Sequence, residues 1–358
     1  MRAPPIERIG ILRWLHKNLF NNWINTLITT ALMVLLVILV PPLISWAFIN
    51  SVWNSTDPQA CVEAGGACWA VIAEKHRVML FGFYPYAEQW RPFLAVVIYL
   101  GVLVITALPV FWNWRILLPL WVFGIITIIT LMLGGVFGLP VIETAQWGGL
   151  PLTMIVFSGQ VSVGMPLAVL LALGRRSEKL PILKTICIVV IETMRAIPPV
   201  TVLLIAAVIF PIFLPTGFDI DKMVRIVLAL GFYFACLQAE VIRGGLQAVP
   251  VSQLEAGKSI GLSAWQINWL IVLPQAIRIV IPGLMNHIIQ AFKNSTLVII
   301  VGLFDILNAT SASVADPQWI SYFTEAYLFV ALVYFSGAYS LSKYSKYLEK
   351  KFKVVSHQ

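Results

Sequence analysis

The segment GGLQAVPVSQLEAGKSIGLSAWQINWLIVLPQAI, residues 244–277, predicts a short helix that ends at a glycine. Ser252 and Glu255 have the spacing of a capping box, in which the hydroxyl and the carboxylate accept hydrogen bonds from free amides of the first turn. Gly261 can take the left-handed conformation that ends a helix, so this helix should have only about two turns. Such a short helix is marginal alone and needs neighbours to hold it.

A second helix should follow the glycine. Ser263 and Gln266 repeat the capping box, and Pro274 is expected to end this helix. Two interpretations of the segment stay open. It docks on a partner protein and transmits the partner's motion to the adjoining helices, or it is an interfacial helix packed on lipid headgroups.

Long apolar runs lie on both sides of this segment. Hydrophobic residues make up 59% of the 358 residues and charged residues 11%, with a mean hydropathy of +0.89, which is too apolar for a soluble domain. Because about 20 apolar residues cross the hydrocarbon core, the sequence predicts an all-α membrane protein with about eight transmembrane helices. The expected spans are residues 22–49, 92–111, 116–136, 151–174, 185–209, 222–243, 278–304 and 322–342. Pro198 and Pro199 should kink or break the fifth.

Lys and Arg gather in the segments that an eight-span topology places on one side of the membrane. These residues are Arg2, Arg8, Arg13, Lys17, Arg115, Arg175, Arg176, Lys179, Lys184, Lys258, Lys343, Lys346, Lys350, Lys351 and Lys353. Since short loops rich in Lys and Arg stay in the cytoplasm, both termini and the 244–277 segment are expected there. This topology accounts for most of the net charge of +8, so nucleic-acid binding is not expected.

The four cysteines fall into two pairs by their surroundings. Cys187 and Cys236 lie in expected spans, where they should pack as small apolar residues. Cys61 and Cys68 lie in the outer loop 50–91 and flank two glycines that let the chain fold back. A disulfide between them is the preferred hypothesis, and two free thiols are the alternative.

The 244–277 segment resembles the EAA signature of ABC importer permeases. The residues at that family's spacing are Glu255, Ala256, Gly261, Ile271, Leu273 and Pro274. Gly257 stands where the family usually has Ala, which costs up to about 1 kcal/mol of helix propensity. The resemblance implies that the first helix docks on an ATP-binding subunit. The residues expected at that contact are Ser252, Glu255, Ala256, Gly257, Gly261 and Leu262.

Three other segments resemble the polar amino-acid branch of these permeases. They are ETMRAIPPV (192–200), AEVIRGGLQAVP (239–250) and KNSTLVIIVG (293–302). The resemblance implies a type I importer core of five helices at residues 150–348, which contains the 244–277 coupling loop. Residues 1–149 would then form an N-terminal extension with three transmembrane helices and the periplasmic loop 50–91, like the M-type permease of general L-amino acid transporters. Residues 349–358 would form a cytoplasmic tail.

The resemblance also implies a set of partners in the bacterial inner membrane. This chain would be a transport subunit and not an enzyme, and would form half of a path for L-amino acids. The other half would come from a second permease, related but different, and the complex would add two ATP-binding subunits and a periplasmic amino-acid-binding protein. ATP and Mg would bind the ATP-binding subunits. No cofactor, metal or catalytic residue is expected here: Gly257, Lys258 and Ser259 mimic the end of a phosphate-binding loop, but Ser252 stands where that loop needs a glycine.

Few ionisable residues lie within the expected spans, where they are costly and normally face protein or water. Glu192 with Arg195, and Glu240 with Arg243, each stand three residues apart and can pair on one helix face. Neutralisation of each other is the simpler interpretation, and contact with a substrate is the alternative.

The seventh expected span carries a polar stripe made of Asn286, Gln290, Lys293 and Asn294. Two interpretations are equally open. The stripe lines the translocation path, where amides and an ammonium meet a passing amino acid, or it supplies hydrogen bonds between helices.

Two other classes of function remain as alternatives. An ion-coupled secondary transporter often has inverted repeats, and the sequence shows no such duplication. A membrane scaffold without transport would have little use for the polar stripe.

Overall fold

The computed structural model describes residues 10–177, 180–215 and 217–352. Four of the basic residues behind the predicted orientation, Arg2, Arg8, Lys179 and Lys353, lie outside the described residues. The chain divides into two compact units, Met1–Glu74 and Lys75–Gln358, and the boundary falls within one helix.

The first unit contains helix α1 (Ile11–Leu19), helix α2 (Trp23–Ile44) with a π-helical turn at Ser45–Ile49, helix α3 (Gln59–Ala64) and the start of helix α4 (Ala70–Phe81). Asn22 begins α2, because its side-chain oxygen accepts a hydrogen bond from the amide of Asn25 at 2.8 Å.

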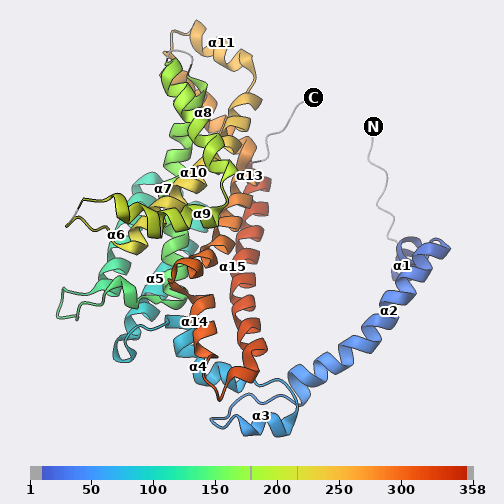
Figure 1. The fold of residues 1–358 in the computed structure, drawn as a ribbon. Helices are drawn as coiled ribbons and strands as arrows, with labels where there is room; N and C mark the ends of the chain where they lie inside the picture. Colours follow the sequence, from blue (N-terminus) through green and yellow to red (C-terminus); the bar gives the residue numbers. More distant parts are fainter. Residues whose placement is uncertain (1–9, 178–179, 216, 353–358) are drawn as a thin grey trace. The chain divides into compact units, whose positions relative to one another are not determined.

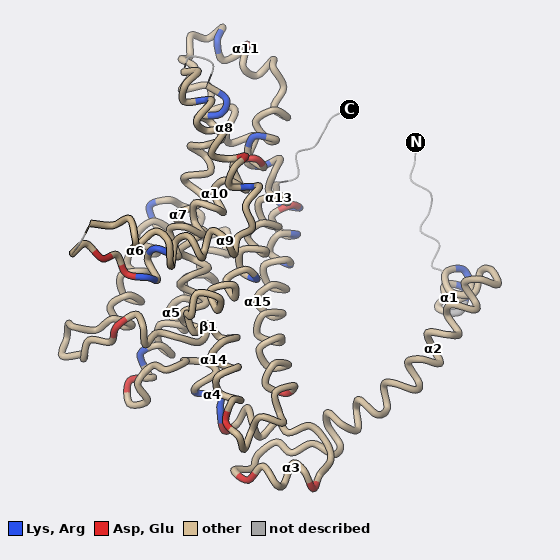
Figure 2. Tube along the Cα trace, viewed as in Figure 1, with Lys and Arg blue, Asp and Glu red and all other residues tan. Residues whose placement is uncertain are grey.

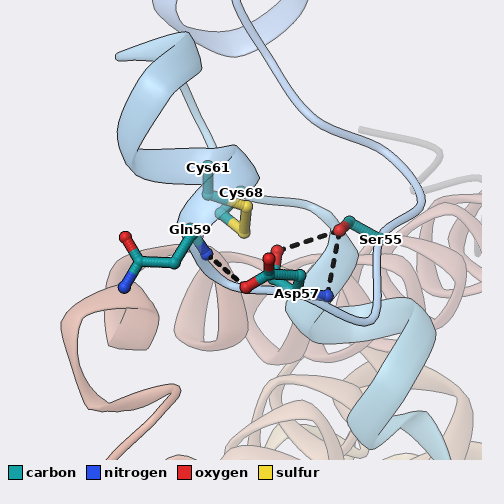
Figure 3. Close-up of a disulfide and its surroundings, with 5 residues drawn as sticks. All are labelled: Ser55, Asp57, Gln59, Cys61 and Cys68. Atoms are coloured by element: carbon teal, nitrogen blue, oxygen red, sulfur yellow. Dashed lines mark hydrogen bonds between the residues drawn. A yellow bond between two sulfur atoms is a disulfide. The ribbon is translucent and has the colours of Figure 1, made fainter.

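A disulfide between Cys61 and Cys68 closes the segment after α2, with 5.4 Å between the two Cα atoms (Figure 3). Between the two cysteines, Gly65 has a φ of 64° and ends α3, which gives the chain the reversal that the sequence suggested. The Asp57 carboxylate accepts a hydrogen bond from the amide of Gln59 at 2.9 Å and so supports the start of α3 (Figure 3).

The second unit is a bundle of long helices (Figure 1). Its α-helices after α4 are α5 (Trp90–Ala107), α6 (Trp114–Leu133), α7 (Gly149–Arg176), α8 (Pro181–Ala196), α9 (Pro199–Leu204), α10 (Lys222–Ala248), α11 (Val251–Ser259), α12 (Ala264–Gln266), α13 (Leu273–Asn294), α14 (Ile306–Ser313) and α15 (Phe323–Phe352). π-helical turns lie at Ile205–Ile209 and Ile267–Val272, and 3₁₀ turns at Tyr86–Glu88, Pro109–Phe111, Thr144–Gln146, Phe210–Phe213, Ser295–Val301 and Ile320–Tyr322. The two-residue strand β1 (Phe304–Asp305) bridges to Gly148 and Gly149.

Seven helices of the described chain are long and apolar enough to cross a membrane, and a bent pair brings the number to eight. The bent pair is Pro181–Ala196 with Pro199–Phe213, and the bend between the two segments is 105°. Ile197 and Pro198, each preceding a proline, have extended backbone, which is the conformation that a following proline ring imposes. The all-α fold with about eight spans and the break at Pro198 and Pro199 are therefore confirmed.

The core of the second unit forms where α7 packs against α10, and α10 against α13. Glycine lets α7 and α10 approach closely: a methyl group on Gly164 would lie 2.7 Å from the carbonyl oxygen of Gly231. Helices α5 and α6 pack on each other, and α5 also packs on α7. The fully buried Arg91 side chain ties α5 to the end of α6, because its Nε donates to the Leu131 carbonyl at 2.6 Å.

Two helix boundaries differ from the sequence-based expectation. Pro250, not Ser252, is the N-cap of α11, because the extended backbone before and at Pro250 ends α10 and starts the next helix directly after the proline. Pro274 does not end the second helix. The chain stays helical from Ala264 to Val301, since the wide π-helical turn before Pro274 accommodates the missing amide of its ring.

Candidate functional site

Helix α11 and its flanking turns lie at one end of the second unit (Figure 1). Its outer side is exposed and carries Ser252, Glu255 and Ala256. Its inner side is apolar: Leu254 packs partly buried against the core between α7, α10 and α13. The helix therefore has one exposed face while its opposite face is held by the bundle.

Gly257 lies on the inner side and is buried. A methyl group at this position would come 2.9 Å from Cγ1 of Ile267 and 3.2 Å from Cδ1 of Ile271. Helix α11 thus lies closer to the following π-helical turn than an alanine would permit without a shift of Ile267. From the sequence alone, Gly257 was expected only to lower helix propensity. The close packing gives a physical reason for a glycine at this position.

Gly261 has a φ of 81°, as its predicted role requires. Its amide donates to the Lys258 carbonyl at 3.0 Å, and the amide of Leu262 donates to the Gly257 carbonyl at 3.1 Å. This pair of bonds is a Schellman motif, which satisfies the last carbonyls of α11 and reverses the chain. Leu262 is half-buried and, like Leu254, packs against the core between α7, α10 and α13. Of the six predicted docking residues, Gly257 and Leu262 therefore turn inward and the other four are exposed.

The second capping box forms as predicted. The Ser263 hydroxyl accepts a hydrogen bond from the amide of Gln266 at 3.3 Å, and the Gln266 side chain accepts one from the amide of Ser263 at 2.8 Å. Two caps, one at each side of the Gly261 corner, therefore fix how α11 joins α13.

The predicted ion pairs within spans both form, and a third arginine joins them. Arg175, in the last turn of α7, donates to Glu192 of α8 at 2.9 Å and to Glu240 of α10 at 3.0 Å. Arg195 contacts Glu192 at 3.2 Å, and Nε of Arg243 contacts Glu240 at 3.0 Å. These three cations and two carboxylates link α7, α8 and α10 close to α11, since Arg175 and Arg243 line the same cavity as Val251 and Leu254.

The central position of Arg175 could not be read from the sequence. Arg175 is 17 residues from Glu192 and 65 residues from Glu240 along the chain, so only helix packing brings them together. The local signal at Arg175 was that of a basic loop, because it sits beside Arg176 at the end of an apolar run. Since both glutamates already have arginine partners, the arrangement favours mutual neutralisation over substrate contact.

The polar stripe on α13 faces away from the rest of the chain. Asn286, Gln290 and Lys293 are exposed and Asn294 is half-buried. Within residues 10–177, 180–215 and 217–352, none of these four side chains has a hydrogen-bond partner. Hydrogen bonding among the described residues therefore does not explain the stripe, and lipid is an unfavourable environment for three amides and an ammonium.

Two buried glutamines hold α13 in this orientation, and the sequence analysis missed both. Nε2 of Gln160 on α7 donates to the Ala291 carbonyl at 3.0 Å, and Nε2 of Gln238 on α10 donates to the Leu284 carbonyl at 3.1 Å. Each glutamine bonds the inward side of α13, opposite the stripe. A lone glutamine within an apolar span was the available signal, since such a residue needs a partner.

Comparisons with known proteins agree with this geometry. Residues 164–354 match the model of the family described as binding-protein-dependent transport system inner membrane component. The chain is 41% identical to the inner membrane amino-acid ABC transporter permease protein YhdY of Escherichia coli K12, over 95% of this chain and 92% of that protein. It is 34% identical to the glutamate/glutamine/aspartate/asparagine transport system permease protein BztC of Rhodobacter capsulatus, over 98% and 96% of the two chains.

A solved structure described as an amino acid ABC transporter with histidines is 28% identical. It aligns with a TM-score of 0.50 and covers 57% of this chain and 92% of that chain. The matched region of the family model contains α11, the Gly261 corner and the stripe of α13. The chain therefore belongs to the family of binding-protein-dependent transport system inner membrane components.

Proposed function

We propose that this chain forms half of the path by which an ATP-driven importer carries L-amino acids across the bacterial inner membrane, and that α11 couples the path to ATP-binding subunits. The chain is a permease subunit of an ABC importer for amino acids, and its family membership favours this function over an ion-coupled transporter or a scaffold. General L-amino acids are the proposed substrates, because the relatives carry amino-acid names and the extension resembles that of the M-type permease.

The observation that carries the coupling proposal is the two-sided character of α11. Its exposed face offers Ser252, Glu255 and Ala256 to a partner, while Leu254 and Gly257 fasten its other face to the bundle. A push on the exposed face is thereby passed to α10 and α13, which adjoin the two ends of the loop. A lone interfacial helix would not need the Schellman corner and the second capping box to fix its angle.

A cross-link from Glu255 tests this docking. In the Glu255→Cys variant, a thiol-linked photoreactive probe should capture an ATP-binding subunit in membranes. Lys346→Cys is the matched control, because Lys346 is exposed on α15 in a segment expected on the same side but outside the loop. Background labelling should be low, since Cys187 and Cys236 are buried and the other two cysteines are paired. Capture of lipid alone at position 255 would contradict the docking role.

The stripe of α13 is proposed as a wall of the translocation path. Its exposed ammonium at Lys293 suits the carboxylate of an amino acid, and the amides of Asn286, Gln290 and Asn294 suit its polar side chain. The stripe would be covered by the second permease subunit, whose related but different sequence supplies the opposite wall. Glu192 and Glu240, for which contact with a substrate was the alternative interpretation, are proposed to position α8 and α10 through the arginine network.

Replacement of Lys293 tests the path. Lys293→Met keeps the length of the side chain and removes the charge, so substrate-stimulated uptake should fall while the complex still assembles. Lys346→Met removes a cation from the exposed end of α15 and should leave uptake unchanged. Equal uptake in the Lys293→Met variant and the natural protein would reject the path role, and loss of assembly in that variant would assign the stripe to subunit packing.

The remaining parts of the complex follow from the same proposal. Two ATP-binding subunits hold ATP and Mg, and a periplasmic amino-acid-binding protein delivers the substrate. Both termini lie in the cytoplasm with α11, residues 150–348 form the transport core, and residues 1–149 form the extension. Within the extension, the disulfide segment faces the periplasm, an oxidising compartment.

A further inference from the structure

A cavity of about 430 Å³ lies at the α11 end of the second unit, where α7 ends and α8 begins. Four basic side chains line it: Arg175, Arg176, Lys184 and Arg243. They come from α7, α8 and α10, so the cavity is built by tertiary packing and not by one helix. Figure 2 shows the basic positions of α8 and α11 at this end of the unit.

Two of these cations are neutralised by carboxylates, and the other two have no carboxylate partner among the residues that the structure describes. Arg175 and Arg243 contact Glu192 and Glu240. Arg176 reaches only the Leu246 carbonyl, at 3.5 Å, and neither Arg176 nor Lys184 forms a salt bridge with any carboxylate of the described residues. The cavity therefore has positive charge to offer to an anion.

Apart from Gln247, the rest of the lining is apolar, which limits the kind of anion. Ile188, Leu246, Val249, Val251 and Leu254 form this part of the wall. A small hydrated anion gains nothing from such a wall, whereas a phosphate group attached to a glycerol and acyl chains contacts both kinds of surface.

Helix α8 carries exposed apolar side chains at Ile182, Ile186 and Val189, which are 76%, 55% and 57% exposed and lie on the face opposite Lys184 and Ile188. The cavity lies at the ends of α7, α8 and α10, which are long and apolar enough to cross a membrane, α8 as part of a bent pair. Basic pockets between transmembrane helices on the cytoplasmic side are known to bind acidic headgroups.

We infer that this cavity binds the phosphate headgroup of an acidic phospholipid of the cytoplasmic leaflet, held by Arg176 and Lys184. The inference rests on the proposed function for one point only, the cytoplasmic orientation of α11. Because Val251 and Leu254 of α11 form part of the wall, a bound headgroup contacts both the bundle and the coupling helix. Binding would thereby stiffen the link between them and make coupling depend on acidic lipid.

Lipid retention by the purified full chain tests the site without any transport measurement. Native mass spectrometry would compare the binding of phosphatidylglycerol, phosphatidylcholine and inorganic phosphate. Each basic residue near a membrane surface contributes about fivefold in affinity, so Arg176→Gln with Lys184→Gln should weaken phosphatidylglycerol binding roughly 25-fold. The control Lys346→Gln with Lys350→Gln removes the same charge from the end of α15 and should keep the natural affinity.

A second variant guards against misfolding. Arg176→Lys with Lys184→Arg keeps both charges and should retain phosphatidylglycerol if the charges do the binding. Equal loss in the α15 control would show a general surface effect and overturn the site. Competition by inorganic phosphate as strong as by the lipid would overturn the lipid assignment, and release of the lipid when ATP-binding subunits dock would assign the cavity to that partner.

The two proposals fail separately. Suppose that the lipid binds as expected, but that ATP hydrolysis by the complex is the same in membranes of phosphatidylcholine alone as in membranes with phosphatidylglycerol. The lipid site then stands, and its effect on coupling is rejected. If position 255 captures no ATP-binding subunit while lipid retention keeps its dependence on Arg176 and Lys184, the docking proposal fails and the lipid site stands.

Discussion

Replacing Gly261 by alanine should loosen the corner that fixes α11. With a φ of 81°, Gly261 lies in the left-handed region, where an L-residue pays about 1–2 kcal/mol. A methyl group there would meet no atom within 4 Å, so the cost is that of the backbone alone and not of a clash. By mass action, this cost makes opening of the corner roughly 5- to 30-fold more frequent.

Hydrogen exchange measures this opening directly. The amides of Gly261 and Leu262 donate the two bonds of the Schellman motif, so their exchange should accelerate by the same factor while exchange in the middle of α10 stays unchanged. Substrate-stimulated ATP hydrolysis by the complex should fall in parallel, because a loose corner passes less of the motion of α11 to the bundle.

Gly244→Ala is the matched control. Gly244 lies inside α10 with ordinary helical backbone and also has no atom within 4 Å of an added methyl group, so alanine there should be neutral or stabilise by up to about 1 kcal/mol. Gly261→Asn should fall between the natural protein and Gly261→Ala, because Asn tolerates the left-handed region better than other residues. Identical exchange in Gly261→Ala and Gly244→Ala would refute the strain at the corner.

Three further outcomes are expected. Ser263→Ala should lower the stability of the turn before α13 by about 1 kcal/mol, seen as faster exchange at the Gln266 amide, and Ser263→Asp should restore it; no change with alanine would deny the cap a role. Alkylation of the unfolded chain should modify two cysteines before reduction and four after it, whereas four modified cysteines without reduction would exclude the disulfide. The Lys75 ammonium lowers the pKa of Asp316 below 3.8, so the carboxylate stabilises the fold above that pH and loses its effect as the pH falls through the lowered pKa. The difference in unfolding temperature between the natural chain and Asp316→Asn should accordingly be present near neutral pH, shrink with added salt and vanish in acid; a difference that persists in acid would rule out the ion pair as its source.

Local backbone chemistry explains which features could be predicted from the sequence. The number of spans, the break at Pro198 and Pro199, the corner at Gly261 and the box at Ser263 each depend on a few neighbouring residues or on one apolar run. The start of α11 at Pro250 and the continuation of the next helix through Pro274 were predicted wrongly, although both prolines are present in the sequence. A proline both ends one helix and presets the next, and a π-helical turn can absorb its missing amide, so the same residue has two structural outcomes.

By itself the sequence determined that this chain is a bundle of membrane helices with a capped loop between two of them, because hydrophobic length and capping are local properties. Only the tertiary structure decided that Arg175 joins Glu192 to Glu240, that the polar stripe of α13 faces outward, and that Arg176 and Lys184 share one cavity. These facts depend on how α7, α8, α10 and α13 pack, and the packing angle between helices is set by glycine contacts and buried glutamine bonds between residues far apart in the chain.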